Sequence, residues 1–173
     1  CILHPVTSET NIMRQQASDL FEALKGSGKY FVVIRPNNDP GSEDIMAVID
    51  ALPKSQFKVI PSMSFGRFSE LLKNAACIVG NSSAGVREAP FLGVPSLDVG
   101  SRQSDRAFGP SITKADAGQQ DKIARFLQQN WHSRHLRQTE FGHGNATQKF
   151  IDILKSDAFW QRSMQKYFND FVQ

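Results

Sequence analysis

Short apolar runs of strand length recur along this chain, and most are followed by a segment with the apolar spacing of a helix. The predicted strands are 1–3, 30–34, 57–60, 77–79 and 95–99, and the predicted helices are 7–24, 42–52, 65–75, 83–92, 117–131, 145–154 and 157–171. Continuous apolar strands are typical of a parallel sheet that helices cover on both faces. The sequence therefore predicts an α/β fold with an open parallel sheet in three layers.

Composition limits the classes of protein to consider. A chain of 173 residues with 40% hydrophobic and 21% charged residues can bury one core and is not expected to be disordered. Its net charge of +3 suits an anionic ligand and is too small to indicate nucleic acid. No apolar run approaches the roughly 18 to 20 residues of a membrane helix. Two cysteines cannot form a disulfide framework, so a reducing, cytoplasmic setting is expected.

The chain opens on the apolar residues 1–3 and then turns at His4-Pro5. Proline lacks a backbone donor and favours an extended residue before it. We expect residues 1–3 to be the last part of a buried strand whose beginning is missing, and the chain to be the C-terminal piece of something longer.

Ligands of open parallel sheets bind at the carboxyl ends of the strands. The loops expected at that edge are 4–8, 35–41, 60–64, 80–85 and 100–106. Function is therefore to be sought in these five loops.

The loop Gly80-Asn81-Ser82-Ser83-Ala84-Gly85 connects a predicted strand to a predicted helix. Small residues let backbone N–H groups approach an anion at a helix start, and two hydroxyls add donors that suit a diphosphate. An ordinary helix cap with a tight turn explains the pattern equally well. Glu88 follows on the predicted helix, where its carboxylate could accept both ribose hydroxyls or only complement the helix dipole.

Arg102 and Arg106 follow the next predicted strand. Two guanidinium groups facing a helix start would offset a diphosphate without a metal. The alternative is a solvated loop, because Asp98 and Asp105 cancel much of the charge.

His4 ends the first predicted strand and would face the same crevice. Its imidazole could bond a phosphate oxygen or stabilise a leaving group, although a structural role in the turn is the commoner one. Asn37 and Asp39 are ordinary turn formers by the same reasoning.

Several motifs occur here in one order, and together they resemble the C-terminal half of the UDP-N-acetylglucosamine 2-epimerase family over roughly residues 4–154. They are His4-Pro5-Val6-Thr7, the segment 36–42, the block Asn-Ser-Ser-Ala-Gly-Val-Arg-Glu at 81–88, Gly93-Val94-Pro95, Gly100-Ser101-Arg102-Gln103 and the segment 141–146. The non-hydrolysing branch has His-Arg-Arg-Glu at the first of these and Asp-Ser-Gly-Gly at the third. The chain thus looks like the hydrolysing branch.

The resemblance implies the C-terminal Rossmann-like domain of a GT-B-type enzyme with two domains. Residues 1–155 would bind UDP, and residues 156–173 would form a C-terminal helix that packs back toward the missing N-terminal domain. The implied reaction is anti elimination of UDP from UDP-GlcNAc, or from a 4-acetamido analogue, followed by addition of water to give the 2-epimeric free sugar. Members of this branch feed sialic and nonulosonic acid biosynthesis.

The resemblance also implies roles for individual residues. Ser82 and Ser83 with Gly85 would hold the diphosphate, and Glu88 the ribose. The positions matching further contacts are Arg102 at the phosphates, Asn37 at the nucleotide, and His4, the one catalytic candidate, at the departing phosphate. Arg106 is a candidate for substrate binding from its place in the loop with Arg102.

The resemblance implies neither a metal nor a cofactor, and the family tends to form dimers or tetramers. Its acid/base carboxylates belong to the N-terminal domain, so this chain alone is expected to bind UDP weakly and not to turn over a UDP-sugar. His143 stands where the family usually has Asp, and no role is transferred to it.

Two other functions remain open from the sequence. One is the C-terminal half of a GT-B UDP-sugar glycosyltransferase, which shares the fold but transfers the sugar to an acceptor. The other is a non-catalytic nucleotide-binding subunit. The block at 81–88 favours the epimerase over the first, and the truncated first strand argues against the second.

Overall fold

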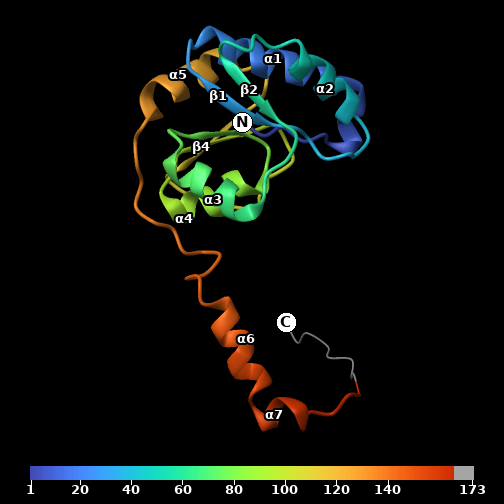
Figure 1. The fold of residues 1–173 in the computed structure, drawn as a ribbon, viewed down its shortest axis with the longest axis vertical. Helices are drawn as coiled ribbons and strands as arrows, with labels where there is room; N and C mark the ends of the chain where they lie inside the picture. The colour runs from blue at the N-terminus through green and yellow to red at the C-terminus, as the bar shows by residue number, and fades with distance from the viewer. Residues whose placement is uncertain (166–173) are drawn as a thin grey trace, which may run out of the picture. The chain divides into compact units, whose positions relative to one another are not determined.

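A computed structural model describes residues 1–165 of the chain (Figure 1). It contains two compact units, residues 1–138 and residues from 139 onward, and each is described by itself. None of the helices in the described part is long and apolar enough to cross a membrane.

The first unit is built on parallel strands, and residues 1–3 join its two halves. β1 (Phe31–Ile34) pairs with β2 (Phe57–Ile60), and β3 (Ile78–Gly80) pairs with β4 (Ser96–Val99), which pairs with β5 (Ile112–Ala115). Ile2 bridges Ile34 on one side and Gly80 on the other, so the N-terminus lies in the middle of the sheet (Figure 1). If residues 1–3 are counted as the first strand and β1 to β5 as the second to sixth, the strands lie in the order 3-2-1-4-5-6 across the sheet. This is the order of the Rossmann fold.

Gly80 makes this junction possible. Its φ is +127°, and a Cβ atom there would lie 1.9 Å from the carbonyl oxygen of Ile2. Only glycine accepts both the backbone angle and the approach. With that space free, the Asn81 N–H donates to Ile2 O at 3.1 Å and the Ile2 N–H donates to Val79 O at 3.0 Å.

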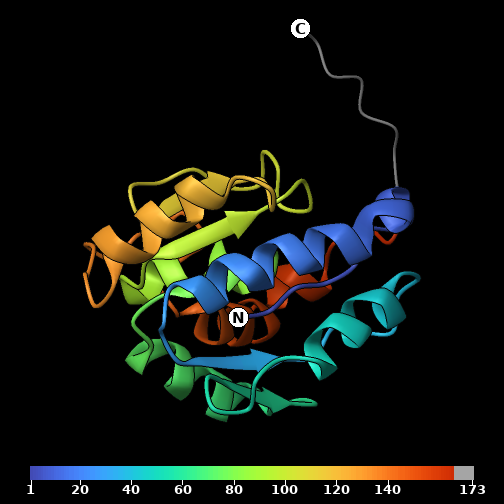
Figure 2. The same ribbon diagram turned by 90° about the horizontal axis from the view of Figure 1, so that it is seen from above.

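Helices cover both faces of the sheet, as the sequence predicts. Figure 2 shows α5 (Gln120–Asn130), α1 (Met13–Gly26) and α2 (Ser42–Asp50) side by side over the strands. α3 (Phe65–Asn74) and α4 (Glu88–Leu92) lie on the other face (Figure 1). Each face has its own apolar cluster: one centres on α1 with Leu20, Phe21 and Leu24, and the smaller one includes Leu72, Ile78, Ala84, Ala89 and Val94.

Three predicted elements differ in the structure. The helix expected at 83–92 is a 3-10 turn, η2 (Ser83–Gly85), followed by α4, because the backbone leaves the helical path at Arg87. The helix expected from residue 7 begins as a 3-10 helix, η1 (Thr7–Ile12), before α1. β5 is absent from the prediction because its half-polar sequence, Ile-Thr-Lys-Ala at the sheet edge, has no continuous apolar run.

The second unit contains α6 (Ala146–Leu154) and α7 (Asp157–Trp160). The predicted helix 157–171 is wrong for residues 161–165, which follow α7 without helical structure, and residues 166–171 lie outside the described part. Ser163 offers a physical reason, because its hydroxyl accepts from the Gln165 N–H at 3.2 Å and so competes with a helical bond. Large apolar side chains of this unit are exposed, among them Phe150, Phe159 and Trp160.

The buried α-amino group of Cys1 makes the stability of a chain that begins there depend on pH. It donates to Val32 O at 2.7 Å, and burial lowers its pKa from 8.0 to about 6. The unfolded chain therefore binds this proton more tightly, so the free energy of unfolding should rise by roughly 2 kcal/mol as the pH increases from 6 to 8. Chemical denaturation across this range measures the change. N-terminal acetylation removes the charge and should remove this part of the pH dependence; an identical dependence in the acetylated chain would contradict the prediction.

Asp98 is a buried carboxylate on β4 that destabilises the fold at neutral pH. It is 2% exposed, and neither carboxylate oxygen has a hydrogen-bond partner among the described residues. Burial raises the pKa of this carboxyl, partly opposed by Lys114, so stability should fall as the pH rises from its ordinary pKa through the raised one.

Asp98→Asn removes the charge while keeping the shape. At pH 7 it should raise the free energy of unfolding by about 1 kcal/mol or more, and the melting temperature by roughly 2 to 4 °C. Melting curves between pH 4 and 8 measure this, with the exposed Asp116→Asn as the matched control. A melting temperature that Asp98→Asn lowers or leaves unchanged at pH 7 would show that the carboxylate is well accommodated.

Candidate functional site

The candidate site lies where the two halves of the sheet meet. Residues 1–3 and β3 are neighbours in the sheet at this point, and the chain continues from each of them into a loop. In doubly wound sheets, the loops at such a point diverge and open a crevice. Asn81, which is 3% exposed, bridges the two loops. Its Oδ1 accepts from the His4 N–H at 2.6 Å, and its Nδ2 donates to His4 O at 2.8 Å. One amide therefore fixes the backbone of His4 beside the loop after β3.

His4 is held with a defined tautomer. The backbone N–H of Asn37 donates to His4 Nδ1 at 3.2 Å, so in the neutral ring the proton is on Nε2. Burial, and then the positive charge of Arg102, lower the pKa of His4, while the side chain of Asn37 and the charge of Asp39 act in the opposite direction. A neutral imidazole with Nε2–H as its donor can bond an anionic oxygen near pH 7 without carrying charge itself.

The loop after β4 reaches back to the same place. Arg102 Nη1 donates to Asn81 O at 3.2 Å, and the fully buried Gln103 donates to the same oxygen through Nε2 at 2.8 Å. Arg102 and His4 thus both bond to Asn81. Arg106 is exposed, and its backbone N–H donates to Gln103 O at 3.2 Å. This contact involves the backbone of Arg106 and does not place its guanidinium beside Asn81.

Ser82 and Ser83 open the tight turn after β3, and both are half-buried. The hydroxyl oxygen of Ser82 accepts from the Ala84 N–H at 3.3 Å, and its carbonyl accepts from the Gly85 N–H at 3.0 Å. Gly85 is required by space, since a Cβ atom there would lie 2.7 Å from Ser96 Oγ. The turn therefore presents two hydroxyls beside the Asn81 junction on a closely packed backbone.

Glu88 is the first residue of α4 and not part of a helix continuous with Ser83. The residue is half-buried, and its Oε2 is buried with no hydrogen-bond partner among the described residues. Leaving a carboxylate oxygen unpaired is costly. A hydroxyl donor on a ligand would satisfy it.

Three residues of this site had no assigned role in the sequence reasoning. Asn81 and Gln103 lie inside the family-like motifs, but their contribution is to hold backbone, which no local pattern reveals. Glu9 accepts from the hydroxyl of Ser101 and from Gln16, and these bonds lower the pKa of its carboxyl. It thereby ties the loop after the first strand to the loop that carries Arg102.

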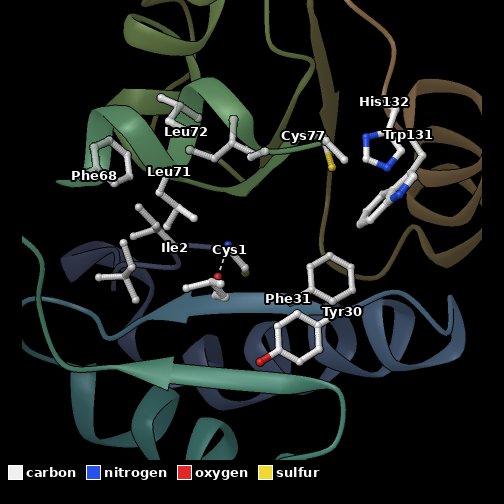
Figure 3. Close-up of a pocket in the computed structure, with 15 residues that line it drawn as sticks. Cys1, Ile2, Tyr30, Phe31, Phe68, Leu71, Leu72, Cys77, Trp131 and His132 are labelled. Atoms are coloured by element: carbon white, nitrogen blue, oxygen red, sulfur yellow. Dashed lines mark hydrogen bonds between the residues drawn. The ribbon is translucent and has the colours of Figure 1, made fainter. Parts of the chain in front are cut away.

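The described residues include no group of three or more His, Cys, Asp or Glu side chains that could hold a metal ion. A cavity of about 230 Å³ lies elsewhere, beside Cys1 and between β1 and Cys77 (Figure 3). Its lining is mainly apolar, with Phe31, Leu72 and Trp131 among the residues. Burial raises the pKa of the Cys77 thiol to about 11, so the thiol is protonated and a poor nucleophile.

Known proteins are similar to this chain in sequence and in fold. The family profile described as UDP-N-acetylglucosamine 2-epimerase matches residues 1–155. A UDP-N-acetylglucosamine 2-epimerase of Neisseria meningitidis is 39% identical over 172 residues, which are 98% of this chain and 46% of the relative. A hydrolysing UDP-N,N'-diacetylbacillosamine 2-epimerase of Legionella pneumophila is 25% identical over 157 residues, 90% of this chain and 41% of that one. The chain thus spans less than half the length of these relatives.

A solved structure gives the same fold. The UDP-GlcNAc 2-epimerase of Methanocaldococcus jannaschii, in complex with UDP-GlcNAc and UDP, matches with a TM-score of 0.68 and 16% identity over 88% of this chain and 44% of that one. This likeness places the domain in the GT-B class of folds. With the profile match over residues 1–155, it establishes the relationship: the chain belongs to the UDP-N-acetylglucosamine 2-epimerase family.

Proposed function

We propose that this chain is the nucleotide-binding half of a hydrolysing UDP-N-acetylglucosamine 2-epimerase. The observation that carries the proposal is the convergence on Asn81, which holds the backbone of His4 and accepts from Arg102 beside the Ser82-Ser83 turn. A cation, a neutral imidazole N–H and two hydroxyls beside one junction suit a diphosphate. The hydrolysing relative of Legionella pneumophila supports the subtype.

The proposed site would bind UDP-GlcNAc or a 4-acetamido analogue. Arg102 would pair with the diphosphate, Ser82 and Ser83 would donate to it through their hydroxyls, and Gly85 would keep the backbone close. Glu88 would accept from the ribose hydroxyls, which would satisfy its unpaired oxygen. Asn37 would contact the nucleotide, and Arg106 would add positive charge at the rim.

His4 is the catalytic candidate of this half. In the elimination step the bond from sugar C1 to the diphosphate oxygen breaks with its electron pair going to UDP, while C2 loses its proton to a base. His4 Nε2–H would donate to the departing phosphate oxygen and stabilise its growing charge. Water then adds across the C1–C2 double bond, giving the free sugar with C2 inverted. We assign the proton transfers at C2 to the other half of the enzyme.

We further propose that residues 1–155 bind UDP and that residues 156–173 pack toward an N-terminal domain outside this chain. The exposed apolar side chains of Phe159 and Trp160 support this packing. A homodimer or tetramer, a cytoplasmic location and a place in sialic or nonulosonic acid biosynthesis complete the proposal. Two free cysteines are in keeping with a reducing compartment.

The half-site is expected to bind UDP without the other domain, and calorimetric titration of the 173-residue chain measures this. Arg102→Ala and Ser82→Ala should each weaken UDP binding about tenfold, because a hydrogen bond to a charged group contributes roughly 1.5 to 3 kcal/mol. The matched controls are Arg14→Ala, at an exposed residue, and Ser69→Ala, at a half-buried one; both lie outside the site and should keep the wild-type affinity. Equal weakening in the controls, or none in the site variants, would contradict the assignment.

The chain alone is expected not to turn over UDP-GlcNAc, since the base at C2 is assigned outside it. UDP release from UDP-GlcNAc, followed with a coupled assay, should stay at the background of the buffer. Sustained release with formation of the 2-epimeric sugar would refute this division of labour. In the full-length protein, release of UDP that requires a sugar acceptor would indicate a glycosyltransferase instead.

A further inference from the structure

Residues 133–138, which we call the strap, follow α5 and run along α4 (Figure 1). The His135 N–H donates to Gly93 O at 2.9 Å, and the Gln138 N–H donates to Pro90 O at 3.1 Å. The strap therefore bonds to the carboxyl-terminal part of the helix that begins with Glu88.

Side chains fasten the strap at both ends. Arg134 donates to Ala75 O at 2.9 Å, at the end of α3. The Arg137 guanidinium lies 4.4 Å from the ring centre of Phe91 on α4, and Gln138 Nε2 donates to the buried Ser111 hydroxyl at 2.8 Å. These contacts fix the strap against the body of the first unit and not only against α4.

Gly93 shows how close the two segments are. It ends α4 with a φ of +68°, and a Cβ atom there would lie 2.3 Å from His135 O. Both the backbone angle and the contact with the strap exclude any larger residue. α4 has only five residues, too few for a helix to be stable by its own hydrogen bonds, so its orientation depends on what packs against it.

We propose that the strap is a positioning element for Glu88: by holding the end of α4, it sets where the carboxylate lies and thereby controls recognition of the ribose. The inference rests on the proposed function, in which Glu88 accepts from the ribose hydroxyls. Glu88 Oε2 is buried and has no hydrogen-bond partner among the described residues, so a shift of α4 would change which donor this oxygen can reach. The strap residues themselves act through α4 and need not touch the ligand.

The test compares binding of UDP and of 2'-deoxyuridine diphosphate to the 173-residue chain by NMR titration. The ratio of the two dissociation constants reports the ribose contact and does not change when part of the protein is unfolded, because both ligands then lose the same share of sites. The wild-type chain should prefer UDP about tenfold. Glu88→Gln should reduce that preference and serves as the reference.

Gly93→Ala should reduce the preference to the level of Glu88→Gln, because its methyl group displaces the strap. Gly28→Ala is the matched control: its φ is +66°, so the backbone strain is the same, but nothing lies within 4 Å of the added carbon. This control should keep the wild-type ratio. Gln138→Ala, which removes the side-chain bond to Ser111 and the packing over Gly109, should lower the ratio several-fold and decides the matter if Gly93→Ala does not fold.

The possible results separate the two proposals. If the wild-type chain does not prefer UDP, or Glu88→Gln keeps the preference, the ribose role in the proposed function is wrong and this inference is overturned with it. If Glu88→Gln loses the preference while both strap variants keep it, only the role of the strap is wrong.

Discussion

Two hydrogen bonds between the Asn81 amide and the backbone of His4 hold the site together. They join loops that are 77 residues apart in the chain, at the point where the two halves of the sheet meet. The carbonyl of Asn81 also accepts from Arg102 and Gln103. One small buried residue therefore relates the imidazole, the guanidinium and the hydroxyl-bearing turn to one another. The position of the Arg102 guanidinium follows from this network of hydrogen bonds around a neutral residue.

The electrostatics of the site are modest because its charged groups are few and partly buried. His4 is neutral near pH 7, since burial and Arg102 both disfavour its protonated form. Arg102 is thus the cation at the Asn81 junction, and a diphosphate would be shared between it, neutral donors and the turn after β3. Neutral donors that the fold already orients toward a ligand cost little free energy on binding, because they do not have to reorganise when the ligand arrives.

The sequence predicts much of this arrangement, and the parts it misses have physical causes. Apolar runs such as 30–34 and 77–79 predict buried strands directly, so the predicted α/β fold with helices on both faces of the sheet is confirmed. β5 has no such run because one edge of it is solvated. The turn containing Ser82 is visible as a motif, whereas the break at Arg87 has no local sequence signal. The hydrogen bonds of Asn81 and Gln103 link residues about 20 or more positions apart, which no local pattern encodes.

The central place of residues 1–3 in the sheet has a consequence for how the chain folds. Their partners are far along the sequence: Cys1 bonds to Val32, 31 residues away, and His4 to Asn81, 77 residues away. Such non-local pairings must close long loops before they contribute, which slows folding. β1 and β2, or β3 and β4, can pair early as separate halves, but each keeps an open edge until the first strand inserts between them. The candidate site lies at that seam, so it is assembled only once the first strand has joined the two halves.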